Sequence, residues 1–244
     1  MPLLEVQRVS KGFGGVRAVH DVSFRLDEGE LVGIMGPNGS GKTTLFNMIA
    51  GSLAPDAGHV RLGGQEIGGL APHRVCAHGI ARTFQLVRPF AGLTALENVL
   101  VGRLFGRAAG AGAVAEAERL LALVGLEGRG RVPAAQLTLI DRKRLELARA
   151  LATEPSLLLL DEVMAGLNPT EIETIIGLIR GIHRSGVSIL LIEHNMRAVM
   201  ALSQRIVVLS FGERIAEGAP ADIANHPKVV EAYLGEEYVG AAPA

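Results

Sequence analysis

The nine residues GPNGSGKTT, at positions 36–44, restrict the fold of this chain more than any other part of its sequence. They match the phosphate-binding loop pattern G-x-x-x-x-G-K-[ST] at every fixed position. The apolar run LVGIM precedes them and the apolar-periodic stretch KTTLFNMIAGSL follows, which predicts a buried strand before the loop and a helix after it. A glycine-rich turn that only happened to precede a lysine would lack this context. The sequence therefore predicts a P-loop nucleotide-binding core of the α/β class.

Each residue type in the loop suits the binding of phosphate. Glycines let backbone N–H groups wrap around the β-phosphate, and the N-terminus of the following helix adds positive potential. We expect Lys42 to reach the β- and γ-phosphates and the Thr43 hydroxyl to ligate Mg²⁺. The predicted nucleotide-binding residues are those of the whole loop: Gly36, Pro37, Asn38, Gly39, Ser40, Gly41, Lys42, Thr43 and Thr44.

Strand-like and helix-like segments alternate after the loop. Apolar runs predict buried strands at residues 156–162 and 187–194, with a helix between them at 169–186. This alternation indicates a largely parallel sheet. The first thirty residues instead alternate apolar and polar side chains and predict antiparallel strands, and hairpins are expected at 59–67 and 205–218.

Residues 72–149 have a helical, alanine-rich pattern. We therefore expect a single domain, residues 1–244, with a helical subdomain over about 86–154. The tail at 239–244 consists of small, unpatterned residues and is expected to be disordered.

Composition excludes several classes of protein. The net charge of −1 gives no support to a general nucleic-acid footprint, so we expect no nucleic-acid partner. No apolar run approaches the ~20 residues that span a bilayer, the start lacks the features of a secretory signal, and the single cysteine, Cys76, can form no intrachain disulfide. The mean hydropathy of +0.32 fits a buried parallel sheet together with a surface that docks onto something apolar. The chain is expected in the cytoplasm.

Two carboxylates follow the second buried strand, in LLLLDE. Ligands of open α/β sheets bind at the carboxyl ends of strands, which places Asp161 where it can hold a Mg²⁺ shell. Glu162 is the candidate general base for the water that attacks the γ-phosphate. His194, at the exit of the next strand, and Gln85, at the start of a loop, are weaker candidates when each is taken alone.

Together these residues resemble the ATP-binding subunit of an ABC transporter, in that family's order and over nearly the whole chain. The resemblance implies that Phe13 lies under the adenine, that Gln85 is the Q-loop glutamine and a Mg²⁺ ligand, and that His194 senses the γ-phosphate. It makes Glu162 the catalytic glutamate and residues 165–168, AGLN, the D-loop. It also implies a P-loop core, an N-terminal antiparallel β subdomain and a helical signature subdomain.

Within this family, three stretches are similar to the branched-chain amino-acid uptake group: GIARTFQLVRPFAGLTALENVLVG, DEVMAGLNPTE and GERIAEGAPADI…HPKVVEAYLGE. The resemblance implies an importer of branched-chain or related amino acids, with urea and amides as alternative solutes. It implies a peripheral location on the cytoplasmic face of the cell membrane. The implied partners are membrane permease subunits and, indirectly, a solute-binding protein.

The stretch LTLIDRKRLELARAL, residues 137–151, lies where the family has its Leu-Ser-Gly-Gly-Gln signature. Thr138 and Asp141 fit a capping box at the start of a helix, and Thr138 keeps the hydroxyl of the signature, which implies contact with nucleotide. Both glycines are replaced, by Leu139 and Ile140, so the close approach that a missing Cβ permits is lost. A carboxylate near the γ-phosphate would repel it unless Asp141 turns back towards its own helix.

In the family this helix N-terminus meets the ATP held by the other subunit of a head-to-tail dimer. We therefore favour pairing with a second, non-identical ATPase subunit; the alternative is a tolerated subfamily variant with normal function. The main rival function is a nucleotide-binding assembly or regulatory subunit with little ATPase activity. A nucleic-acid or ribosome ATPase and a small-molecule P-loop kinase are less consistent with the motifs, and HRVCAH does not have the spacing of a zinc site.

Overall fold

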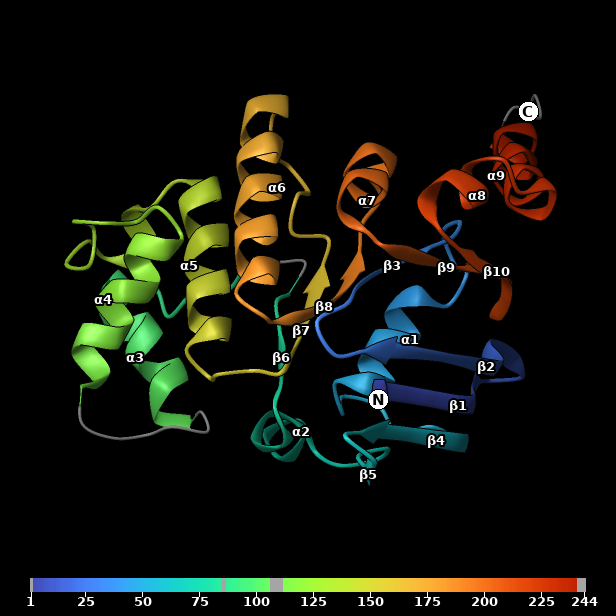
Figure 1. The fold of residues 1–244 in the computed structure, drawn as a ribbon, viewed down its shortest axis with the longest axis horizontal. Coiled ribbons are helices and arrows are strands. Elements are labelled where there is room, and N and C mark those ends of the chain that lie inside the picture. The colour runs from blue at the N-terminus through green and yellow to red at the C-terminus, as the bar shows by residue number, and fades with distance from the viewer. Residues whose placement is uncertain (1, 85–86, 106–111, 241–244) are drawn as a thin grey trace. The chain divides into compact units, whose positions relative to one another are not determined.

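The computed structural model describes residues 2–84, 87–105 and 112–240 (Figure 1). Their contacts divide them into two compact units. The first unit consists of residues 2–72 and 190–240, and the second consists of residues 73–189. The chain passes from the second unit to the first within strand β8 (Ser188–Ile192). Whether the chain is a single domain with a helical subdomain at 86–154 stays a prediction.

The first unit begins with an antiparallel sheet of strand order β2-β1-β4-β5. Val6 of β1 lies opposite Phe24 of β2 and Val60 of β4, so the apolar side chains of successive strands share one face. The alternating pattern of the first thirty residues therefore predicted these strands correctly. Their bounds are β1 Pro2–Phe13, β2 Val16–Asp27, β4 Ala57–Leu62 and β5 Gln65–Glu66.

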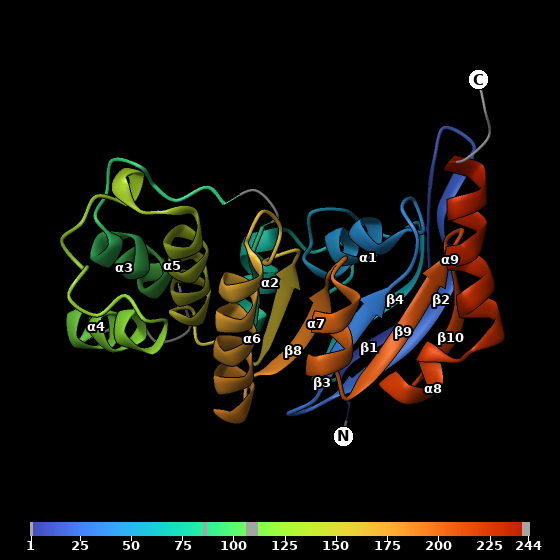
Figure 2. The same ribbon diagram turned by 90° about the horizontal axis from the view of Figure 1, so that it is seen from above.

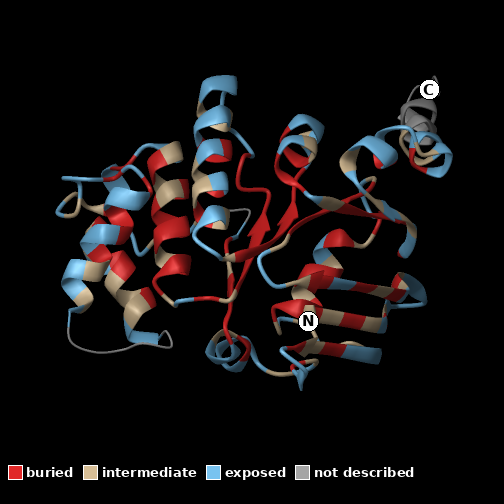
Figure 3. Ribbon diagram, viewed as in Figure 1, coloured by how far each residue is buried: buried red, intermediate tan, exposed pale blue. Residues whose placement is uncertain are grey.

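A second set of strands in this unit leads into the phosphate-binding loop. Strands β3 (Leu31–Met35) and β9 (Arg205–Ser210) run parallel, with Met35 opposite Val208, and β10 (Glu213–Gly218) returns antiparallel to β9. Residues 31–35 are all buried, which explains why β3 is a continuous apolar run (Figure 3). The helices of the unit are α1 Lys42–Ile49, α7 Met196–Leu202, α8 Pro220–Ala224 and α9 Pro227–Gly240.

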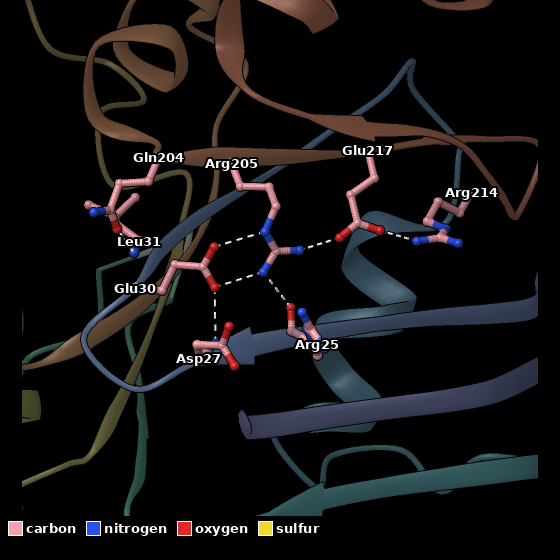
Figure 4. Close-up of polar contacts among 8 residues, drawn as sticks. All are labelled: Arg25, Asp27, Glu30, Leu31, Gln204, Arg205, Arg214 and Glu217. Carbon is pink, nitrogen blue, oxygen red and sulfur yellow. Dashed lines mark hydrogen bonds and ion pairs between the residues drawn. The ribbon is translucent and has the colours of Figure 1, made fainter. Parts of the chain in front are cut away.

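An ion-pair network joins the starts of β3 and β9 to the end of β10 (Figure 4). The Arg205 guanidinium donates to both carboxylate oxygens of Glu30, at 2.8 and 2.7 Å, and also pairs with Glu217 of β10. Burial acts to raise the pKa of the Glu30 carboxyl, but the hydrogen bonds from Arg205 and from the Asp27 backbone lower it overall. Leu31, at the start of β3, donates its N–H to the Gln204 side chain at 2.9 Å. The network fixes the register of β3 against β9 at the end opposite the loop.

The second unit contains two short parallel strands and a helical region. Strands β6 (Ile80–Arg82) and β7 (Leu157–Asp161) pair in parallel, with Ile80 opposite Leu157. Helices α3, α4 and α5 pack against one another (Figures 1 and 2). The helices of this unit are α2 Pro72–His78, α3 Ala95–Phe105, α4 Ala113–Leu123, α5 Leu139–Leu151 and α6 Pro169–Arg184, with a 3₁₀ turn at Ala134–Gln136.

One sequence expectation about the fold is wrong. Residues 72–149 are not helical throughout, because β6 lies within them; three residues are too few to show a periodicity. The disorder expected for the tail at 239–244 stays a prediction; helix α9 ends at Gly240. Residues 241–244 lie outside the described part of the chain. No helix among the described residues is long and apolar enough to cross a membrane.

Candidate active site

The phosphate-binding loop requires glycine at two positions for steric reasons. Gly36 has φ of +147°, and a Cβ atom there would lie 2.1 Å from the backbone oxygen of Leu209. Gly41 has φ of +100°, and its Cβ would lie 2.3 Å from the backbone oxygen of Ala18. Both separations are far below van der Waals contact, and both φ values disfavour L-residues. The backbone conformation of the loop therefore depends on the glycines that the motif specifies.

Lys42 directs its ammonium group into this loop. Its Nζ donates to the backbone oxygens of Gly36 at 2.6 Å and Pro37 at 2.8 Å, and lies 3.4 Å from the Ser40 hydroxyl. The residue is 6% exposed, so the charge is held against the loop rather than in solvent. A phosphate bound by the loop would meet this ammonium.

The start of α1 is also suited to an anion. Its N-cap residue, Gly41, supplies no side-chain acceptor to the first N–H groups. Its first turn contains no acidic residue that would compete with a phosphate. The N–H groups of the first turn and the helix dipole therefore act together with Lys42, and the residues present fit a nucleotide phosphate.

Two other predicted residues lie in the same unit as the loop. Phe13 ends β1 and is 49% exposed, with the Lys11 ammonium 5.8 Å from its ring centre. Its exposed ring is compatible with stacking on a base. His194 is exposed in the connection between β8 and α7, where Asn195 caps the helix.

The second unit places the two acidic candidates at the end of β7. Asp161 is buried, and its carboxylate accepts a hydrogen bond from Arg82 at 2.7 Å. Its N–H donates to the Thr83 hydroxyl at 3.3 Å, which ties the ends of β6 and β7 together. Arg82 and Thr83 were not predicted as site residues, because nothing in ARTF separates them from ordinary strand residues.

Glu162 adopts φ of +49°, which is uncommon for a residue with a side chain. It is buried, and its backbone oxygen accepts the N–H of Ala165 in a tight turn. Backbone strain of this kind concentrates at functional positions. The strain is therefore consistent with the predicted role of Glu162 as the general base.

Gln85 lies outside the described residues, but its neighbour Phe84 is described. The Phe84 N–H donates to the Glu146 carboxylate of α5 at 3.1 Å. Burial raises the pKa of the Glu146 carboxyl to about 7, against the lowering effects of that hydrogen bond and of Arg149 and Lys143. A buried carboxylate therefore joins α5 to the residue before Gln85, and the sequence analysis did not identify it.

The helix α5 begins where the sequence predicted, with Thr138 as N-cap. The Thr138 hydroxyl accepts the N–H of Asp141 at 3.3 Å, which confirms half of the expected capping box. The Asp141 carboxylate accepts from the Thr138 hydroxyl at 2.9 Å, from Arg129 at 2.6 Å and from Arg144 at 3.3 Å. The carboxylate is thus turned towards its own unit, and two guanidinium groups compensate its charge.

Leu139 and Ile140 occupy the first turn of α5 as expected. Leu139 is 48% exposed, and its Cδ2 atom lies 3.4 Å from the position that a Cβ on Gly166 would take. Residue 166 belongs to the predicted D-loop. The bulk that replaces the first signature glycine therefore packs beside that loop, while α5 keeps its N-terminal backbone donors.

The acidic and hydroxyl side chains are of the kind that Mg²⁺ prefers. Asp161 of the second unit supplies a carboxylate and the exposed residue Thr43 of the first unit supplies a hydroxyl, and each group is of a kind that Mg²⁺ accepts as a ligand. Among the described residues, no three His, Cys, Asp or Glu side chains are grouped so that they could hold a metal ion. The predicted site residues thus divide between the two units: the loop, Phe13 and His194 in the first, and Asp161, Glu162 and Thr138 in the second.

Comparison with known sequences agrees with these motifs. The profile of the ABC transporter family matches residues 19–165, and that of the branched-chain amino acid ATP-binding cassette transporters matches residues 213–239. The chain is 40% identical to the high-affinity branched-chain amino acid transport ATP-binding protein BraF of Pseudomonas aeruginosa, over 96% of this chain and 98% of that protein. It is also 40% identical to LivG of Salmonella typhimurium, described in the same words, with the same coverage.

Solved structures give the same result. The fold matches the ADP conformation of MJ1267, an ATP-binding cassette of an ABC transporter, with a TM-score of 0.87 and 31% identity over 96% of this chain and 99% of that one. It matches the dimeric ATP-binding cassette MJ0796 bound to ADP and Pi with a TM-score of 0.79 and 28% identity, over 89% of this chain and 98% of that one. The predicted fold class is confirmed.

Proposed function

Since this chain belongs to the ABC transporter family as an ATP-binding and hydrolysing subunit, we propose that it powers the uptake of branched-chain or related amino acids. The observation that carries this proposal is the match of its C-terminal residues 213–239 to the branched-chain cassette group. Relatives named for branched-chain amino acid transport share 40% of its residues over nearly full length. Solute selectivity would reside in other subunits, so urea or amides are the alternative cargo.

We assign the catalytic roles from the chemistry of the side chains. Glu162 accepts a proton from the water that attacks the γ-phosphate, and Lys42 compensates the charge that develops on the phosphate. His194 holds the γ-phosphate and the water in line, and Gln85 contributes to the site from the Q-loop. Thr43, Asp161 and Gln85 would hold Mg²⁺, which neutralises phosphate charge when it is bound.

We expect the chain to contact both ends of the nucleotide, the phosphates and the adenine. The loop residues 36–44 surround the phosphates with backbone N–H groups, while Phe13 packs against the adenine. Thr138 acts on the nucleotide of a partner subunit, from the N-terminus of α5. This role supports a head-to-tail dimer, and one structural relative is described as dimeric.

We propose that the partner is a second, non-identical ATPase subunit. Leu139 and Ile140 place side chains where the signature has glycines, so the ATP site completed by this chain's α5 is the weaker one. The site built on this chain's own loop and Glu162 is then the stronger one. In a homodimer both sites would contain the altered signature.

The subunit would act at the cytoplasmic face of the membrane. Two exposed apolar side chains on either side of Gln85 in the sequence, Phe84 at 51% and Phe90 at 49%, support docking of this region onto a permease. A solute-binding protein would contribute indirectly, by signalling through the permease.

One experiment tests cargo and partners together. The chain, its permease, a second ATPase and a binding protein would be reconstituted in proteoliposomes, and ATP turnover would be measured with each solute. We expect leucine, isoleucine or valine to stimulate turnover severalfold, and Lys42→Ala to abolish it. Stimulation by urea or amides alone would reassign the cargo. Turnover that is insensitive to every solute would favour the rival role, an assembly or regulatory subunit with little ATPase activity.

A further inference from the structure

The C-terminal helix α9 contacts the first residue of the phosphate-binding loop. The Tyr233 hydroxyl oxygen accepts a hydrogen bond from the backbone N–H of Gly36 at 2.9 Å. The two residues are 197 positions apart in the sequence and belong to the same unit. This contact was not foreseen from the sequence, which named no site residue beyond His194.

Tyr233 is fixed at both ends of its side chain. Its ring packs against a buried apolar cluster that contains Met35, the residue before Gly36, and Val208 of β9. Its hydroxyl group then reaches the point where β3 becomes the loop. A tyrosine places an oxygen at this point with few rotatable bonds, so little conformational entropy is lost in holding it there.

Gly36 is held from three directions. The Tyr233 hydroxyl oxygen accepts a hydrogen bond from the Gly36 N–H. The backbone oxygen of Leu209 lies so close to Gly36 that a Cβ could not be accommodated. The Gly36 backbone oxygen, in turn, accepts the Lys42 ammonium at 2.6 Å. A continuous chain of hydrogen bonds thus runs from the α9 side chain through one glycine residue to the lysine that faces the phosphates.

We propose that Tyr233 is a positioning residue of the nucleotide site, through which α9 and nucleotide binding influence each other. The inference rests on the proposed nucleotide site and adds to it a coupling to the C-terminal helix. Tyr233 lies within residues 213–239, the part matched by the branched-chain profile, whereas the loop lies within the general family profile at 19–165. The coupling therefore links a part of the chain specific to the group to machinery shared by the whole family.

Removal of the hydroxyl group leaves the Gly36 N–H without this acceptor and loosens the start of the loop. We expect Tyr233→Phe to bind both MgADP and MgATP roughly 3- to 10-fold more weakly, since a single hydrogen bond of this kind is lost. Both nucleotides should be affected alike, because the loop that begins at Gly36 surrounds the β-phosphate, which ADP and ATP share. Coupling is reciprocal, so nucleotide binding should also slow amide exchange in α9.

The test is a titration of the full chain with a fluorescent ATP analogue and with MgADP, for wild type, Tyr233→Phe, Tyr238→Phe and Lys42→Ala. Tyr238→Phe is the matched control, because it removes the same hydroxyl group from the same helix. The expected result is weaker binding by Tyr233→Phe, near-wild-type binding by Tyr238→Phe, and slowed exchange in residues 227–240 that nucleotide induces in wild type and not in Tyr233→Phe.

A purely structural role for Tyr233 would give a different result. The melting temperature of Tyr233→Phe would fall, but its nucleotide affinity below that temperature and the exchange response of α9 would equal those of wild type. This outcome overturns the inference and leaves the proposed function intact. Equal binding by Lys42→Ala and wild type would instead overturn the nucleotide site itself, and the inference with it.

Discussion

The Asp141 carboxylate of α5 lies 2.6 Å from the guanidinium group of Arg129, twelve residues earlier in the chain. Arg144 and the Thr138 hydroxyl bind the same carboxylate. A negative charge at the start of the signature helix would oppose a bound phosphate, but here two positive charges compensate it. The negative charge that the altered signature introduces at Asp141 is therefore compensated by Arg129 and Arg144.

This arrangement makes Asp141 important for stability. Asp141→Asn replaces charge-assisted bonds with neutral ones and leaves two guanidinium groups facing an amide, so we expect the free energy of unfolding to fall by about 1–3 kcal/mol. Urea unfolding measures the change. Glu116→Gln is the control, because it weakens an i,i+3 pair with Arg119 whose side chains are 28% and 63% exposed, and should cost less than about 0.5 kcal/mol. Equal effects of the two substitutions would show that the Asp141 ion pairs add no more to the free energy of unfolding than the Glu116–Arg119 pair does.

The bulk of Leu139 and Ile140 should limit the ATP site of the partner subunit. The variant Leu139→Gly/Ile140→Gly permits a closer approach of α5 to a phosphate, and we expect faster ATP turnover by the assembled transporter. The same change should lower the free energy of unfolding by about 1–2 kcal/mol, because glycine disfavours the helix. Leu139→Ala/Ile140→Ala, which keeps Cβ atoms, is the comparison variant. Turnover that is unchanged or lower in the glycine variant would mean that the altered signature is already fully active.

The loop conformation predicts that a side chain at position 36 lowers the free energy of unfolding by a large amount. Gly36→Ala would place a Cβ 2.1 Å from the Leu209 oxygen, so we expect a loss of at least about 3 kcal/mol in the free energy of unfolding. Gly63→Ala is the matched control: its φ of +53° is also positive, but nothing lies within 4 Å of its Cβ, and strain alone costs about 1–2 kcal/mol. Similar losses in the two variants would exclude the steric explanation.

The raised pKa of the Glu146 carboxyl predicts that the free energy of unfolding depends on pH. Its pKa is raised by burial to about 7 in the folded chain, above its ordinary value of 4.5, so the folded state binds more protons between these two values. The corresponding stability is fully present below pH 4.5 and is lost as pH rises through about 7. Glu146→Gln, which keeps an acceptor for the Phe84 N–H, should therefore gain stability relative to wild type between pH 5 and 8.5, by up to about 3 kcal/mol.

Unfolding at several pH values checks this expectation. Glu97→Gln is the control, since hydrogen bonds from the Thr94 backbone and hydroxyl lower the pKa of the exposed Glu97 carboxyl. Its difference from wild type should stay constant over the same pH range. A constant difference for Glu146→Gln as well would show that Glu146 does not titrate there.

The sequence predicted the elements whose burial is visible in a single stretch. Strands β3 and β7 are apolar on both faces, and the loop between β3 and α1 has a fixed pattern of glycines. Strand β6 escaped prediction because three residues show no periodicity. The C-terminal helices α8 and α9 were not assigned either.

The parts of the site that were missed depend on residues far apart in the chain. Tyr233 reaches Gly36 across 197 positions, and Arg82 reaches Asp161 across 79. Both residues lie in stretches that resemble the branched-chain group, but the sequence gave neither of them a role in the site, so only the fold reveals it. Asp141 is an intermediate case: its capping position was predicted, but its pairing with Arg129 was not.

The central claim is that this chain hydrolyses ATP with Glu162 as the general base. The most direct measurement is ATP turnover by the transporter assembled from wild-type chain or from Glu162→Gln, with bound ATP measured in the same samples. We predict that Glu162→Gln binds ATP as tightly as wild type, while turnover at this chain's site falls by roughly 100-fold or more. Turnover at the wild-type rate with Glu162→Gln in place would contradict the account.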